Sequence, residues 1–112
     1  MLAAALAGCA GPPCDREPPL DWDNWGRAFM TDFCGGCHSV LYGEEDRDEA
    51  PLGVDFNTYG DVMHWSGRVL ERVSVTADMP PAGGPSEEER AMLEEWITCS
   101  VEPDKAALEA QE

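Results

Sequence analysis

Two cysteines and a histidine are the residues of this sequence best suited to carry chemistry. Cys34 and Cys37 are separated by two glycines, and His38 follows directly. Two thiols at this spacing can add across the two vinyl groups of a haem, and the adjacent imidazole can then bind the iron. The pattern predicts one covalently attached haem c, with thioether bonds from Cys34 and Cys37 and with His38 as the proximal iron ligand.

Two other uses of a Cys-x-x-Cys pair fit the sequence less well. A thioredoxin-like redox pair follows a strand in a βαβ pattern, which the sequence does not show. A zinc site needs a second pair of cysteines or histidines at metal-ligand spacing, and none is visible in the sequence. Haem attachment is therefore the interpretation that the residues favour.

The composition limits the size and class of the protein. Its 112 residues are enough for one small domain but not for separate catalytic and cofactor domains. The net charge of −16 repels phosphates, which argues against nucleic acid as a partner. Four Trp, three Phe and five Met are more core-forming residues than a disordered acidic tail carries. We therefore expect one small, acidic, folded domain.

Three segments carry apolar residues at the spacing of a buried helix face. Each begins with a side chain that can accept hydrogen bonds from the first turn: Asp21 or Asp23, then Thr58, then Ser86. The first helix is expected to end at the Cys34 motif and the third at Cys99. Long loops rich in proline and glycine join them, so the sequence predicts an all-α fold of three main helices around the haem.

Residues Leu6 to Cys9 resemble the lipobox of bacterial lipoproteins. In that family the peptide before the cysteine is removed, and the new N-terminal cysteine carries lipid. The resemblance implies a signal peptide at residues 1–8, lipid on Cys9, and an exported protein in the periplasm or cell envelope of a bacterium. A lipid anchor rather than a transmembrane helix would then hold it to a membrane. The alternative is an ordinary export signal with an incidental cysteine.

The chain on either side of the folded domain is more polar. Residues 9–20 are rich in proline and are expected to form an extended tether, and residues 21–100 form the domain itself. Residues 101–112 are predicted as a polar C-terminal tail, in which Pro103 begins either a short helix or a disordered end.

Two cysteines remain once haem and lipid have been assigned. They are Cys14 and Cys99. An even number of remaining cysteines outside the cytoplasm favours a disulfide, and two free thiols are the alternative.

The chain between Asp23 and Cys99 resembles a class I c-type cytochrome domain. In that family a helix precedes the attachment motif, a methionine in a Pro-rich loop supplies the second axial ligand, and a C-terminal helix crosses the first. The resemblance implies a cytochrome c-like fold. Gly26 on the first helix and Trp96 on the last would face each other, because a small residue opposite an aromatic ring lets two helix axes approach closely.

Met79 is the expected distal iron ligand. It lies in a loop beside Pro80-Pro81, and this Met-Pro pair is similar to the ligand loop of the family. The other methionines of the mature chain lie on apolar helix faces, where methionine usually fills the core. His64 is the alternative ligand, and ligation by two histidines would lower the reduction potential, whereas His/Met ligation raises it.

Four side chains are candidate partners of the haem propionates. They are Tyr59, Trp65, Arg68 and Arg72, whose N–H, O–H or guanidinium groups can satisfy a carboxylate. The alternative is that each serves packing or lies on the surface.

The resulting hypothesis is one-electron transfer by Fe(II)/Fe(III) cycling, without enzymatic catalysis. The net charge of −16 favours a redox partner with a basic docking patch. Two alternatives remain open. One is a haem-based ligand sensor or weak peroxidase in which Met79 leaves the iron, and the other is a haem-binding subunit of a larger envelope complex.

Overall fold

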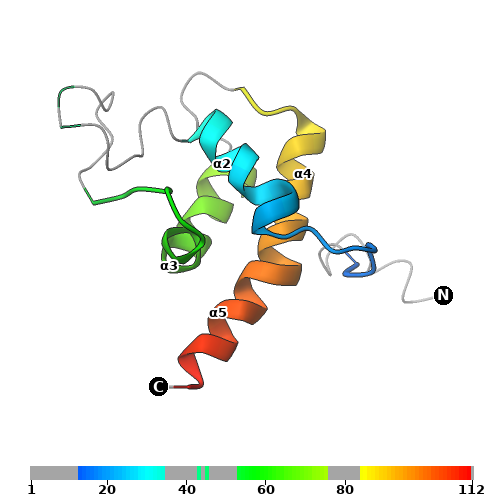
Figure 1. Cartoon of the computed structure of the whole chain (residues 1–112). Helices are drawn as coiled ribbons and strands as arrows, with labels where there is room; N and C mark the ends of the chain where they lie inside the picture. The colour runs from blue at the N-terminus through cyan, green and yellow to red at the C-terminus, as the bar shows by residue number, and fades with distance from the viewer. Residues whose placement is uncertain (1–12, 35–42, 44, 46–52, 76–83, 112) are drawn as a thin grey trace.

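The computed structural model describes residues 13–34, 43, 45, 53–75 and 84–111. Most of these residues lie in three continuous helices, whose arrangement is drawn in Figure 1. The first comprises a π-helical turn and an α-helix: η1 (Trp22–Gly26) and α2 (Arg27–Phe33). The second comprises α3 (Tyr59–Leu70) and η3 (Glu71–Val75). The third comprises α4 (Glu87–Trp96), η4 (Ile97–Val101) and α5 (Glu102–Glu109). The described residues contain no strand, so the predicted all-α class is confirmed.

All three helices begin with a capping box, in which two side chains satisfy N–H groups that have no partner inside the helix. Asp21 Oδ1 accepts from the backbone N–H of Asn24 at 2.7 Å, and Asn24 Oδ1 accepts from the N–H of Asp21 at 2.8 Å. The same reciprocal arrangement opens the other two helices: Thr58 with Asp61, and Ser86 with Glu89. Of the two candidate caps for the first helix, Asp21 is the one used.

The core lies where the three helices meet. Its fully buried side chains come from all of them: Met30 from the first; Val62 and Ser66 from the second; Leu93, Trp96, Ile97 and Val101 from the third. Phe29, Val69 and Val73 are also buried. The residues of each helix recur at three- and four-residue spacing, so each helix turns one apolar face inward.

The third helix extends further than the sequence predicts. It does not end at Cys99 but continues to Glu109, and Val101 at its centre is fully buried. Pro103 lies next to the junction of η4 and α5, and the chain stays helical through it. Of the two alternatives for the predicted tail, the structure has the helix.

Two hydroxyl groups of α3 hold α5 in place. The buried Ser66 hydroxyl donates to the Glu102 carboxylate, and the Tyr59 hydroxyl donates to Asp104 Oδ2 at 2.6 Å. Each bond joins a neutral donor to a charged acceptor, which is stronger than a bond between neutral groups.

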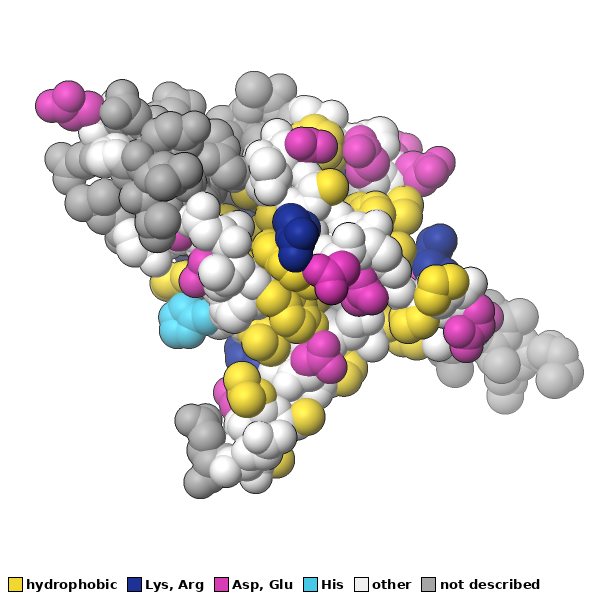
Figure 2. Space-filling model, in the orientation of Figure 1, with side chains coloured by type: hydrophobic (Ala, Val, Ile, Leu, Met, Phe, Trp, Pro, Cys, Tyr) yellow, Lys and Arg dark blue, Asp and Glu magenta, His cyan; other side chains and the backbone are white. Residues whose placement is uncertain are grey.

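The surface carries many acidic side chains, and several gather over the start of α4 (Figure 2). Among the residues placed by the structure, no helix has both the length and the apolar composition that crossing a membrane requires.

Candidate functional site

Cys34, the first cysteine of the attachment motif, directly follows the last residue of α2. Its backbone N–H bonds to the carbonyl of Met30 at 2.9 Å, and its side chain is only 9% exposed. Cys34 belongs to the same apolar cluster as Phe29 and Met30. A sulfur atom in such surroundings is suited to a thioether bond with a large apolar ring.

The other residues of the predicted haem site fall in segments whose placement is not described. Cys37, His38 and Met79 lie outside the described residues, as does the predicted lipidation site Cys9. Both thioethers, the two iron ligands and the lipid therefore stay predictions.

Large apolar side chains around the core are only partly covered. They pack against the buried cluster from all three helices and the segment before α3: Trp22, Trp25, Phe33, Phe56, Tyr59, Met63, Trp65, Leu70 and Met92. A domain of this size buries only about 60–70% of its unfolded surface, so partly covered apolar side chains are expected around its core.

The first and third helices cross at Gly26 and Trp96. A Cβ atom built on Gly26 would lie 2.5 Å from Cη2 and 2.8 Å from Cε2 of Trp96, closer than real Cβ contacts allow. Only glycine therefore fits this crossing without a shift of the ring or the backbone. The predicted close approach of these two residues is confirmed.

Four aromatic rings meet around this crossing. Trp96 stacks with Trp22 and with Tyr59 at centroid distances of 6.4 Å and 6.2 Å, and Trp25 meets it edge-on at 5.9 Å. The indole Nε1 of Trp96 is buried and has no hydrogen-bond partner among the described residues. An unsatisfied buried donor of this kind costs about 1–3 kcal/mol.

The structure separates Tyr59 from the other three candidate propionate partners, Trp65, Arg68 and Arg72, which lie within about 60° of one another around the second helix. At about 100° per residue, Trp65 and Arg72 lie about 120–140° around the helix from Tyr59. The Tyr59 hydroxyl is bonded to Asp104, and burial together with this bond holds its pKa well above the usual range of a tyrosine. Arg68 is exposed on α3.

His64, the alternative iron ligand, is exposed on α3. Its ring meets Trp65 edge-on at a centroid distance of 4.7 Å. His64 is therefore a surface side chain in this structure.

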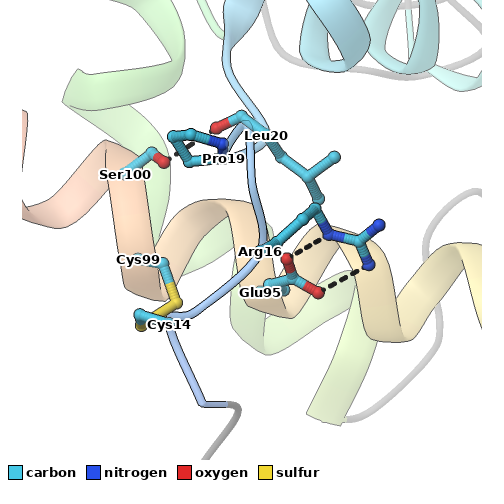
Figure 3. Close-up of a pocket in the computed structure, with 7 residues that line it drawn as sticks. All are labelled: Cys14, Arg16, Pro19, Leu20, Glu95, Cys99 and Ser100. Atoms are coloured by element: carbon cyan, nitrogen blue, oxygen red, sulfur yellow. Dashed lines mark hydrogen bonds and ion pairs between the residues drawn. A yellow bond between two sulfur atoms is a disulfide. The ribbon is translucent and has the colours of Figure 1, made fainter.

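Cys14 and Cys99 are joined, with their Cα atoms 5.4 Å apart, as the sequence analysis expected (Figure 3). The pair connects the N-terminal segment to the third helix. A two-point ion pair lies beside it: Arg16 Nε is 2.6 Å and Nη2 is 3.0 Å from the two carboxylate oxygens of Glu95. The Arg16 hydrogen bonds lower the pKa of the Glu95 carboxyl, although partial burial opposes them.

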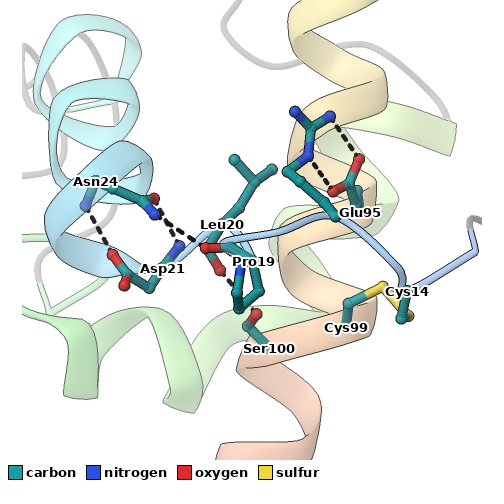
Figure 4. Close-up of polar contacts among 9 residues, drawn as sticks. Cys14, Pro19, Leu20, Asp21, Asn24, Glu95, Cys99 and Ser100 are labelled. Carbon is teal, nitrogen blue, oxygen red and sulfur yellow. Dashed lines mark hydrogen bonds and ion pairs between the residues drawn. A yellow bond between two sulfur atoms is a disulfide. The ribbon is translucent and has the colours of Figure 1, made fainter.

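Further polar bonds hold the rest of this segment (Figure 4). The Ser100 hydroxyl donates to the carbonyl of Leu20 at 2.8 Å, and Asn24 Nδ2 donates to the carbonyl of Pro19 at 2.9 Å. The Leu20 side chain is 7% exposed. The described part of the predicted tether therefore lies along the third helix and is bonded to it at several points.

Sequence reasoning found the cysteine pair but missed Arg16, Glu95 and Ser100. Arg16 and Glu95 are 79 residues apart. Neither residue belongs to a motif. The sequence signal for this ion pair is that each residue lies close in the sequence to one cysteine of the expected disulfide.

Comparisons with models of protein families, with curated proteins and with solved structures found no match for this chain.

Proposed function

We propose that this chain is a monohaem c-type cytochrome that carries single electrons in the cell envelope. The observation that carries the proposal is the position of Cys34, the first residue of the Cys34-x-x-Cys37-His38 motif. It directly follows α2 and is buried in the apolar cluster. An attachment cysteine there would hold a flat apolar group against the core.

Each residue of the proposed site has a separate task. Thioether bonds from Cys34 and Cys37 would prevent loss of the haem, and His38 and Met79 would hold its iron. The haem supplies a reversible one-electron change at its iron, and ligation by His and Met raises its reduction potential. The apolar side chains beside Cys34 exclude water, which favours the less charged, reduced form.

The helix crossing supports the same proposal. Class I cytochromes pack their first and last helices closely, and Gly26 and Trp96 allow such an approach here. The crossing lies on the same helix as Cys34, eight residues before it in the sequence. A rigid crossing at this distance would hold the attachment cysteine in a constant position.

The test is a pyridine haemochrome spectrum together with the intact mass of the exported protein. We expect one haem bound through two thioethers, and the mass also reports lipid on Cys9. The Cys34→Ser/Cys37→Ser variant is expected to lose its colour after acid extraction, whereas Cys14→Ser/Cys99→Ser keeps it. Mature protein that is colourless and has both motif thiols open to alkylation would overturn the proposal.

The distal ligand has its own test. Met79→Ala is expected to abolish the long-wavelength absorption band of the iron–methionine bond, while Met63→Leu and His64→Ala leave it intact. If the reduced wild-type protein binds carbon monoxide at once, the iron position is open and a sensor or peroxidase becomes the better assignment.

A further inference from the structure

A groove runs along α2 beside the first turn of α4, and we call it the aromatic groove. Its lining includes the rings of Trp25, Phe29 and Phe33 and the acidic side chains of Asp32 and Glu89. The three rings follow one another at four-residue spacing on one face of the helix. Their centroids are 4.8 Å apart from Trp25 to Phe29 and 5.1 Å apart from Phe29 to Phe33.

Part of this aromatic surface is open to solvent. Phe29 is buried, but Trp25 and Phe33 at the two ends of the series are only half-buried. Asp32 is exposed, and Glu89 is half-buried while its Oε1 accepts a hydrogen bond from the N–H of Ser86 at 2.9 Å. The groove therefore combines partly exposed aromatic rings with negative charge.

The charged side chains that line the aromatic groove, Asp32 and Glu89, are both acidic. Glu87 and Glu88 are exposed in the same turn of α4 as Glu89. No lysine or arginine lines the groove among the residues that the structure describes. The net charge of the whole chain, −16, would attract a basic partner from a distance and orient it before contact.

We propose that the aromatic groove docks a lysine- or arginine-bearing segment of the protein with which this chain exchanges electrons. The inference rests on the proposed function. A guanidinium or ammonium group is attracted to the face of an aromatic ring, and a neighbouring carboxylate adds a charge-assisted hydrogen bond. The chain already contains such a contact, because the guanidinium carbon of Arg27 lies 5.9 Å from the centroid of the Trp22 ring.

The position of the groove suits electron exchange. Its last ring, Phe33, directly precedes Cys34 in the sequence. A partner seated on the groove would therefore contact the helix that leads into the proposed haem attachment site. Electron exchange between proteins requires such close approach of the two redox centres.

The test titrates a tetra-arginine peptide into the reduced, isotope-labelled full chain at low ionic strength. We expect chemical-shift changes at the indole N–H of Trp25 and the amides of residues 24–33. Asp32→Asn/Glu89→Gln should weaken binding about threefold to tenfold, which corresponds to two exposed ion pairs. Glutamine at position 89 can still complete the capping box, so the helix start is kept.

The matched control is Glu17→Gln/Glu109→Gln, which removes the same two charges at exposed positions outside the groove. This variant is expected to bind the peptide within twofold of the wild type. Trp25→Leu removes one ring face and is expected to weaken binding with no change in net charge. Equal weakening in both charge variants, or shift changes scattered over the acidic surface, would overturn the inference.

The haem content of each sample, read from its absorption spectrum, separates the two proposals. A haem-loaded protein whose groove does not bind the peptide refutes the docking site alone. A colourless protein whose groove binds it refutes the electron-carrier function while the cation-binding surface stands.

Discussion

Replacing Gly26 with alanine is expected to destabilise the fold, although alanine is the better helix former. The new Cβ would lie 2.5 Å from Cη2 and 2.8 Å from Cε2 of Trp96. Trp96 is fully buried, so its ring cannot turn into solvent to make room. The first and third helices must then move apart, or the ring must leave its preferred rotamer.

The magnitude follows from two opposing contributions. Extra volume in a packed core costs about 1–3 kcal/mol, and a clash with several ring atoms belongs at the upper end. Alanine in place of glycine favours a helix by about 1 kcal/mol. The net loss in free energy of unfolding for Gly26→Ala is therefore about 2 kcal/mol, or a fall in Tm of about 8–16 °C for a domain of this size.

Gly67→Ala is the matched control. Gly67 is also helical, but a Cβ there would meet nothing within 4 Å. The same change of residue should then stabilise the protein by about 0.5–1 kcal/mol. Thermal and denaturant unfolding of both variants, followed by far-ultraviolet circular dichroism, measures the two effects with opposite expected signs.

A second variant tests the cause. Trp96→Phe removes the outer ring atoms that the new Cβ would meet, so Gly26→Ala should cost little in that background. A double-mutant cycle should give a coupling free energy above about 1 kcal/mol. If Gly26→Ala stabilises the protein as Gly67→Ala does, or if the cycle shows no coupling, the packing argument is wrong.

Three further predictions concern other contacts. The Cys14–Cys99 disulfide closes a loop of 85 residues, so reducing it should lower the free energy of unfolding by about 4.5 kcal/mol in the chain-entropy model. Denaturant unfolding with and without reductant measures this loss. The pKa of Tyr59 is raised on folding, so the contribution of Tyr59 to the free energy of unfolding is fully present below pH ~10 and is lost as the pH rises further. Tyr59→Phe should flatten the dependence of this free energy on pH above pH ~10. The pKa of Glu95 is lowered on folding, so the contribution of Glu95 to the free energy of unfolding is lost as the pH falls through the carboxyl range. Denaturant unfolding should show stability falling in acid, and Glu95→Gln should lower the stability at neutral pH and flatten this dependence.

The helix starts and buried faces were predictable because their signals are local. A capping box spans four residues, and Thr58 and Ser86 identify the starts of α3 and α4 without reference to the rest of the chain. The position of Cys34 at the end of the first helix follows in the same way from the glycines after it. The approach of Gly26 to Trp96 was predictable only through the resemblance to class I cytochromes.

Contacts between distant segments were not predictable, because they depend on how the helices sit relative to one another. Arg16 and Glu95 belong to no motif, and only the folded chain brings them together. Tyr59 was a candidate partner for a propionate, but the extension of α5 places Asp104 within reach of its hydroxyl. That extension was itself missed because Pro103 is commonly a sign that a helix has ended.

The bonds at the start of the described chain determine how freely the domain can move. Because Cys14 is fixed to the third helix, a lipid on Cys9, as proposed, would be separated from the folded body by only the five peptide units between Cys9 and Cys14, a reach of about 18 Å. An electron carrier held so near a bilayer would not diffuse between distant complexes. It would serve a partner at the same membrane surface. It would meet that partner by lateral diffusion in the membrane and by rotation about its short N-terminal linker.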